Sequence, residues 1–147
     1  MTFLADLHIH SRFSLATSKE LSARNLDAWA RVKGLNVIAT GDCVHPAWLK
    51  ELQEQLVRDE ESGLYKLAVA HEKLPFLPEK NCLGSQKDPL FLLETEISSI
   101  FKKNGRVRKV HTLVYLPSLE DAKSLARRLE KLGNIASDGR PILGLDP

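Results

Sequence analysis

Two histidines near the start of the chain, His8 and His10, stand two positions apart in the sequence Asp-Leu-His-Ile-His. In an extended strand, residues i and i+2 point to the same face, so this pair could hold one metal ion between two imidazoles. Asp6 could support a histidine ligand by accepting its other ring proton, or bind the metal itself. A buried histidine is more often a hydrogen-bonded part of a core, so the pair needs companions elsewhere.

Further side chains that bind metals occur in segments downstream. They are Asp42, His45, Glu96 and His111. Taken singly, the ordinary role is a turn for Asp42, a surface salt bridge for Glu96 and a core position for His111. Nitrogen and oxygen ligands from four separate segments are much less expected by chance than any one of them. We therefore predict that these four side chains bind metal together with the opening histidine pair.

Mixed histidine and carboxylate ligands suit zinc, manganese or iron. Two such ions about 4 Å apart can activate a water molecule and neutralise the charge of a phosphate, so the predicted chemistry is phosphate-ester hydrolysis. Glu96 is the expected bridging carboxylate because it ends an apolar run, and Glu94 is expected to face the opposite side of the strand. Glu96 and Asp42 are the predicted catalytic residues.

Apolar runs place these candidates at the ends of strands. The runs at 3–9, 35–40 and 90–97 predict buried strands, the run at 110–115 predicts another, and 142–145 could add an edge strand. In α/β folds the ligand site gathers beyond the carboxyl ends of the strands. The candidate ligands fall at such ends.

Three helices are predicted between the strands. The first begins at Ser22 and stops at Gly34, and the second begins at Pro46. The third begins after Ser118, with a capping-box-like Ser-x-x-Asp, and ends before Gly133. Trp29 and Leu132 are expected to face the core. The alternation of strand and helix predicts an α/β fold with a mostly parallel sheet or a barrel.

A basic hairpin is predicted around Asn104-Gly105, the strongest turn signal in the chain. Positive side chains gather on it with no acidic residue between them: Lys102, Lys103, Arg106, Arg108 and Lys109. Such a hairpin could follow a nucleic-acid backbone. An equally weighted alternative is a solvated hairpin whose cations protect a strand edge from aggregation.

Composition sets broad limits on the rest. The 147 residues suit one domain spanning 1–147, and 43% hydrophobic and 27% charged residues are ordinary for a globular protein. A net charge of +2 gives no global field that would demand a nucleic acid. Cys43 and Cys82 lack metal-site spacing, and with no signal sequence or membrane-length apolar run we expect a soluble, cytoplasmic protein. Residues 73–89 are expected to form a long loop, and His71 is not expected to be a ligand.

The opening Asp-Leu-His-Ile-His, the Gly-Asp turn, Thr-Glu-Ile and Lys-Val-His resemble the polymerase and histidinol phosphatase (PHP) superfamily over most of the chain. A narrower set of segments resembles the endonuclease Q group. These segments are His8 to Ser14 with Ala16-Thr17-Ser18, Thr40-Gly41-Asp42 with His45-Pro46-Ala47-Trp48, and Ser137-Asp138-Gly139-Arg140-Pro141.

This resemblance implies a distorted (β/α)7 TIM-like barrel with two or three divalent metal ions, which could be zinc, manganese, iron or magnesium. In the endonuclease Q group it implies cleavage of DNA on the 5′ side of deaminated or abasic nucleotides, including deoxyuridine and deoxyinosine. The six predicted ligands carry over as metal ligands, and Arg12 and Lys109 become candidates for phosphate contacts.

The sequence departs from the superfamily pattern after the second strand, where an Asp-His pair is usual. Here Asp42 is followed by Cys43, and His45 comes two positions later. Later family ligands and strands fall beyond Pro147, so we expect an amino-terminal part of a longer protein with an incomplete metal cluster and doubtful activity on its own. A histidinol-phosphatase-like phosphoesterase and a non-catalytic PHP scaffold stay open as alternatives, and the oligomeric state is not set.

Overall fold

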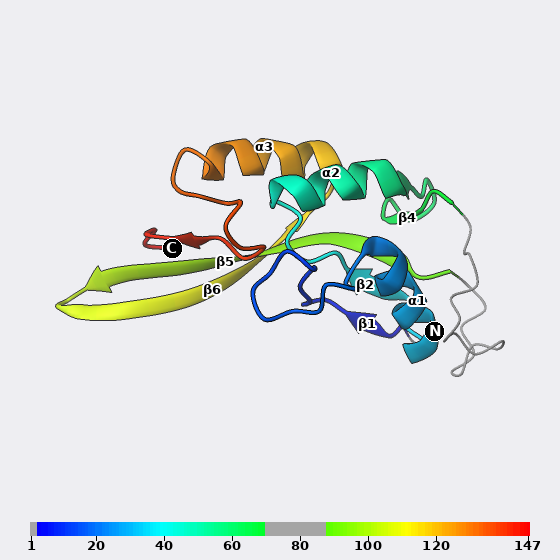
Figure 1. Cartoon of the computed structure of the whole chain (residues 1–147), viewed down its shortest axis with the longest axis horizontal. Coiled ribbons are helices and arrows are strands. Elements are labelled where there is room, and N and C mark those ends of the chain that lie inside the picture. Colours follow the sequence, from blue (N-terminus) through cyan, green and yellow to red (C-terminus); the bar gives the residue numbers. More distant parts are fainter. Residues whose placement is uncertain (1–2, 70–87) are drawn as a thin grey trace.

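The computed structural model describes residues 3–69 and 88–147 of the chain. It has one seven-stranded sheet and three helices (Figure 1). The strands are β1 (Ala5–Asp6), β2 (Val37–Ala39), β3 (Leu56–Arg58), β4 (Tyr65–Leu67), β5 (Leu90–Lys103), β6 (Arg106–Leu116) and β7 (Ile142–Leu143). The helices are α1 (Ala23–Lys33), α2 (Pro46–Gln55) and α3 (Leu119–Leu129). The predicted loop lies outside the described residues except for its last two positions, and so do His71 and Cys82.

The sheet is mixed and open. Strands β1, β2 and β5 are parallel, whereas β4 and β3 complete the order β1-β2-β5-β4-β3 in antiparallel fashion. The outer part of β5 pairs antiparallel with β6 and parallel with β7. The α/β class is confirmed, but a mostly parallel sheet is wrong. Over the described residues the sheet does not close into a barrel, because β1 and β3 end it on either side.

The first strand is shorter and more exposed than its sequence suggested. Only Ala5–Asp6 pairs with β2, and the following segment through His10 is an extended limb without strand pairing. Phe3, Leu4 and Leu7 are exposed. A buried parallel strand over 3–9 is therefore wrong, because β1 is an end strand of the sheet with no strand on its outer side in the described chain.

The helix starts follow the predicted capping residues. The Ser22 side chain accepts a hydrogen bond from the Asn25 N–H, and the Ser118 side chain accepts one from the Asp121 N–H. Gly34 ends α1 in the left-handed conformation, with φ of 70°. Each cap satisfies a backbone group that the helix terminus leaves free, which is why the local sequence fixes these boundaries. No helix in the described ranges is long and apolar enough to cross a membrane.

Two predicted core residues lie at the surface. Trp29 is 47% exposed, because α1 packs inward through Leu26 and Ala30. Leu132 is 56% exposed, because α3 ends at Leu129 and the chain leaves the helical register before it. The core instead centres on Trp48, Phe91 and residues packed around them between the helices and the sheet.

The predicted hairpin at Asn104-Gly105 is confirmed. Both turn residues have positive φ, 53° and 72°, and Lys103 pairs with Arg106 across a two-residue loop. The β5–β6 pairing runs without a break from the Leu93–Leu116 pair to this turn, and its tip projects beyond the rest of the sheet (Figure 1). The 142–145 segment contributes β7, as predicted.

Candidate metal centre

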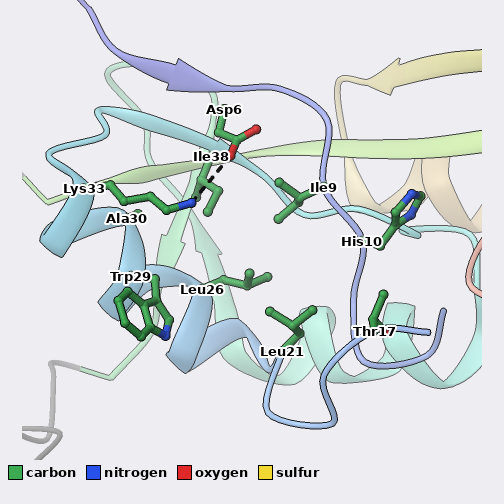
Figure 2. A pocket seen from close by; sticks show the side chains of 10 residues that line it. All are labelled: Asp6, Ile9, His10, Thr17, Leu21, Leu26, Trp29, Ala30, Lys33 and Ile38. Atoms are coloured by element: carbon green, nitrogen blue, oxygen red, sulfur yellow. Dashed lines mark ion pairs between the residues drawn. The ribbon is translucent and has the colours of Figure 1, made fainter. Parts of the chain in front are cut away.

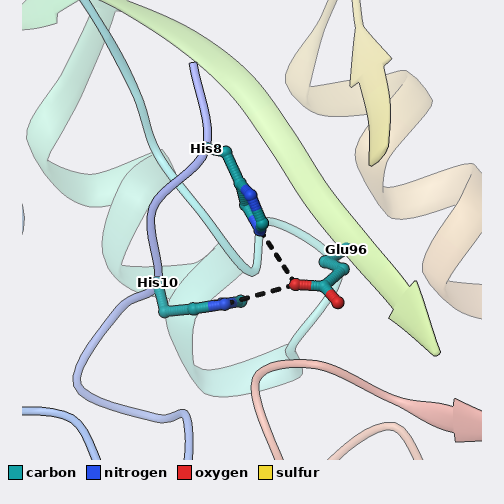
Figure 3. A group of neighbouring side chains, drawn as sticks. All are labelled: His8, His10 and Glu96. Carbon is teal, nitrogen blue, oxygen red and sulfur yellow. Dashed lines mark hydrogen bonds and ion pairs between the residues drawn. The ribbon is translucent and has the colours of Figure 1, made fainter. Parts of the chain in front are cut away.

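His8, His10 and Glu96 meet at one point although 88 positions separate the first from the last (Figure 3). The Glu96 Oε2 atom lies 2.9 Å from Nε2 of His8 and 3.3 Å from Nε2 of His10. One ligand atom from each of the three residues lies within 4.8 Å of the others. The carboxylate is buried, with 1% of its side chain exposed, whereas 48% of the His8 side chain is exposed. Such a group of two imidazoles and one carboxylate can hold a divalent cation at a site open to solvent.

The limb that carries the histidines is held against two neighbours. A side chain at Gly41, which has φ of 61°, would bring a Cβ within 2.5 Å of the Ile9 carbonyl oxygen, so the limb lies directly on this glycine. On the other side, the Tyr115 hydroxyl donates a hydrogen bond of 3.1 Å to the Leu7 carbonyl. These contacts position the two imidazoles over Glu96 even though the limb is not a strand.

Asp42 lies behind His10. Its Oδ1 atom is 3.0 Å from Nδ1 of His10, and its Oδ2 atom accepts hydrogen bonds from the Ser11 N–H, the Ser11 hydroxyl and the Ser14 hydroxyl. Burial opposes ionisation of Asp42, but these hydrogen bonds outweigh it and lower the pKa of the carboxyl. The geometry makes Asp42 an orienting partner that leaves Nε2 of His10 facing the centre.

His10 is held between two carboxylates. Its hydrogen bond with Asp42, helped by the charge of Glu96, raises the pKa of its imidazole against the opposing effect of burial. Without a cation the ring is therefore stabilised in its protonated form. A divalent cation between Nε2 and Glu96 would have to displace that proton, so metal binding should weaken as the pH falls.

The second oxygen of Glu96, Oε1, supplies a further observation. It contacts Nδ1 of His111 and lies 3.8 Å from Nη1 of Arg140, but it is buried with no hydrogen bond of good geometry from any described residue. Buried carboxylate oxygens are rarely left in this state, and a bound cation or its water would satisfy the atom. The residues present thus fit a metal ion held by His8, His10 and Glu96, with His111 beside the second oxygen of Glu96.

Glu94 shares this region, which corrects the prediction that it faces away from Glu96. Residues i and i+2 of a strand point to the same side, and the charges that act on Glu94 are those of Asp42, His10 and Glu96. Its side chain is fully buried, and neither carboxyl oxygen has a hydrogen-bond partner in the described chain. Burial first, and then the charge of Asp42, raises the pKa of Glu94 to about 8.

His45 and Asp6 lie apart from the cluster. The His45 ring caps α2: its Nδ1 accepts from the Trp48 N–H, and its Nε2 is 3.2 Å from the Ala136 carbonyl oxygen. Burial lowers the pKa of this imidazole. Asp6 lies 4.0 Å from Lys33. A ligand role for His45 stays a prediction, and would require the ring to give up its capping contacts.

The predicted phosphate-binding cations differ in their surroundings. Arg12 already forms an ion pair of 2.5 Å with Glu51 on α2 and lies over the Phe13 ring. The hairpin cations are exposed, and among them Lys103 pairs with Asp146 at 3.1 Å.

Sequence reasoning missed Arg140 as a site residue, although the segment Ser137 to Pro141 was part of the resemblance. Asp138 accepts hydrogen bonds from the Leu15 and Arg140 N–H groups, and the Gly139 N–H donates to the Phe13 carbonyl. A Cβ at Gly139 would collide with the Asp42 carboxylate. These contacts hold the loop from Ser137 to Pro141 against the site, and they place the Arg140 guanidinium beside Glu96.

A cavity of about 310 Å³ lies on the other side of His10, between the limb and α1 (Figure 2). Its walls are mainly apolar, from Ile9, Leu26 and the exposed Trp29, and the Asp6–Lys33 pair lies at its rim. Its lining includes His10 but neither His8 nor Glu96.

Comparison with known proteins relates the chain to endonuclease Q. No family model matches. The chain is 34% identical over 141 residues to MJ0043 of Methanocaldococcus jannaschii, which is described as uncharacterized; the match covers 95% of this chain and 13% of that protein.

Two solved structures are similar over 96% of this chain and 29% of theirs. One is the lesion-specific endonuclease PfuEndoQ from Pyrococcus furiosus, with a TM-score of 0.69 and 29% identity. The other is endonuclease Q in complex with a 27-mer duplex that has an abasic lesion at the active site, with a TM-score of 0.70 and 30% identity. The chain thus spans less than a third of the length of these relatives.

Proposed function

We propose that this chain forms the metal-binding part of a divalent-metal-dependent DNA repair endonuclease. The observation that carries the proposal is the convergence of His8, His10 and Glu96 in a chain whose fold is similar to endonuclease Q. Membership of the PHP superfamily, a barrel completed by further strands and a cytoplasmic location belong to the same proposal. The substrate we propose is DNA with deoxyuridine, deoxyinosine or an abasic site, cleaved on the 5′ side of the lesion.

The surroundings of each residue suggest its role in binding the metal, orienting a ligand or binding phosphate. His8, His10, Glu96 and His111 would hold the metal, which when bound lowers the pKa of a water ligand and neutralises phosphate charge. Asp42 keeps a proton at Nδ1 of His10, so that Nε2 presents its lone pair to the centre. Arg140 has 34% of its side chain exposed beside Glu96, where its guanidinium can bind a phosphate oxygen.

The openness of the centre favours a polymeric substrate over a small ester. His8 and His111 are each about half exposed, at 48% and 50%. Small-molecule sites usually bury most of their ligand in a concave pocket. A histidinol-phosphatase-like activity is therefore the weaker candidate.

Calorimetric titration with Mn²⁺ tests the metal site, with Glu96→Gln as the variant and Asp6→Asn as the matched control. We expect about one or more ions per wild-type chain, a loss of affinity of more than about 100-fold in E96Q, and an unchanged affinity in D6N. Absence of binding to the wild type would contradict a hydrolytic centre and leave the scaffold alternative.

Cleavage assays with Mn²⁺ test the substrate. In an endonuclease that contains this chain, a duplex oligonucleotide with one abasic site or deoxyuridine should be cut beside the lesion, and E96Q should abolish the cut. Preference for p-nitrophenyl phosphate over the lesion-containing duplex would contradict the nuclease proposal.

A further inference from the structure

The β5–β6 hairpin has two faces with different surroundings. Because the pairing register is continuous, partners across the hairpin share a face, and faces alternate along each strand. The core face begins with Leu93 and Ile97 on β5, which pack in the hydrophobic core with residues of α2 and α3. The site face begins with Glu96 on β5 and His111 on β6, two members of the candidate metal centre.

Positive side chains continue both faces toward the tip. On the site face, Lys109 lies opposite Ile100 and Lys102 lies opposite Val107. On the core face, Arg108 lies opposite Phe101 and Arg106 lies opposite Lys103, which pairs with Asp146. Within residues 3–69 and 88–147, neither Lys102 nor Lys109 has an ion-pair partner, so both charges are available for binding.

We propose that the site face of this hairpin, through Lys109 and Lys102, binds the phosphate backbone of the DNA as it leads into the metal centre. This inference rests on the proposed function and names the surface that holds its substrate. Lys109 lies two residues from His111 on the same face of β6, roughly 7 Å closer to the hairpin tip. Lys102, which lies opposite Val107, is roughly 13 Å from His111 along the hairpin. The two lysines therefore lie in line from the hairpin tip toward the centre, as a bound phosphate backbone would.

The position of the β5–β6 hairpin relative to the helices favours DNA binding on its site face over its core face. A DNA backbone that reaches the metal centre must approach from the side on which His8, His111 and Arg140 are exposed, because α2 and α3 cover the other side at the base of the hairpin (Figure 1). If the cations only protected the strand edge from pairing, the two faces would be equivalent in DNA binding.

Fluorescence anisotropy of a labelled duplex with one abasic site, in metal-free buffer so that the duplex stays intact and with NaCl varied from about 50 to 200 mM, tests the proposal. The variants are K102Q/K109Q on the site face and R106Q/R108Q on the core face. The control R127Q/R128Q removes two exposed charges from α3. Circular dichroism melting verifies that all three fold.

For K102Q/K109Q we expect the slope of log K against log salt to fall by about 2 and the affinity to fall at least about tenfold at 0.1 M salt. The other two pairs should stay within about twofold of the wild type. Equal losses in both hairpin pairs, or no loss in K102Q/K109Q, would overturn the site-face proposal while DNA binding by the wild type kept the proposed function. A wild type that binds no DNA would overturn both.

Discussion

The two ends of strand β5 carry acidic and basic side chains in opposite environments. Its inner part holds Glu94 and Glu96, both buried, and both oxygens of Glu94 and one of Glu96 lack a hydrogen bond in the described chain. Its outer part carries Lys102 and Lys103, both exposed at the hairpin. Burying a charge without partners costs free energy, whereas an exposed lysine is solvated. We therefore expect single-atom changes to have large effects at the inner end and small effects at the outer end.

The sharpest test of the site beside the inner end of β5 is Asp42→Asn, in the loop after β2, compared with Asp6→Asn on β1. An asparagine cannot accept from His10 and from both serines as the carboxylate does, so we expect Mn²⁺ affinity to fall about 10- to 100-fold and stability to fall by about 1–3 kcal/mol. D6N should change both quantities little, because Asp6 lies near Lys33 at the surface. Calorimetric titration and urea unfolding measure the two effects. Equal behaviour of the two variants would contradict an orienting role for Asp42.

A pH series in metal-free buffer tests the inner end through Glu94. Its folded pKa is raised to about 8, above the ordinary value of 4.5, so between these values the folded state holds a proton that the unfolded state has released. Stability should therefore fall as pH rises from about 4.5 to about 8, with a slope of up to about 1.4 kcal/mol per pH unit. Glu94→Gln should remove this contribution, and Glu60→Gln, at an exposed position, should keep it. A slope between about pH 4.5 and 6.5 that survives in E94Q would exclude Glu94 as the source, because the raised pKa of His10 adds a slope of the same sign only above about pH 6.5.

Alanine variants at two glycines with positive φ, one beside the metal centre and one at the hairpin tip, allow a direct comparison of the two regions. Gly41→Ala would force a Cβ against the Ile9 carbonyl, whereas Gly105→Ala at the hairpin tip would meet no atom within 4 Å. Both pay for a left-handed alanine, about 1–2 kcal/mol, so G105A should lose about this much and G41A clearly more. G41A should also weaken Mn²⁺ binding, because it displaces the limb that carries His8 and His10. Similar unfolding free energies for the two variants would contradict the close contact at Gly41.

The smallest effect is expected from His45→Ala. Loss of the α2 cap should lower stability by about 1 kcal/mol, while Mn²⁺ affinity stays within about twofold of the wild type. The same titration and urea unfolding experiments measure both. A loss of metal affinity comparable to that of a His8→Ala variant would restore His45 to the ligand set predicted from the sequence.

Local signals in the sequence predicted local structure well. The caps at Ser22 and Ser118, the stop at Gly34 and the Asn104-Gly105 turn all occur where predicted, since each depends on hydrogen bonds or dihedral angles within a few residues. The strand at 3–9 and the inward position of Trp29 were wrong. Both depended on which surfaces the rest of the chain covers, and periodicity does not contain that information.

For the site, the sequence by itself determined the supply of side chains: two histidines at strand spacing, an aspartate after β2, and a glutamate and a histidine on what became β5 and β6. Only the tertiary structure decided their arrangement. It joined His8, His10 and Glu96, set Asp42 behind the ring of His10, turned His45 to a helix cap and brought Arg140 to the rim. These outcomes depend on distances between atoms 30 to 90 positions apart, which packing and loop anchoring fix and which residue type and spacing do not specify.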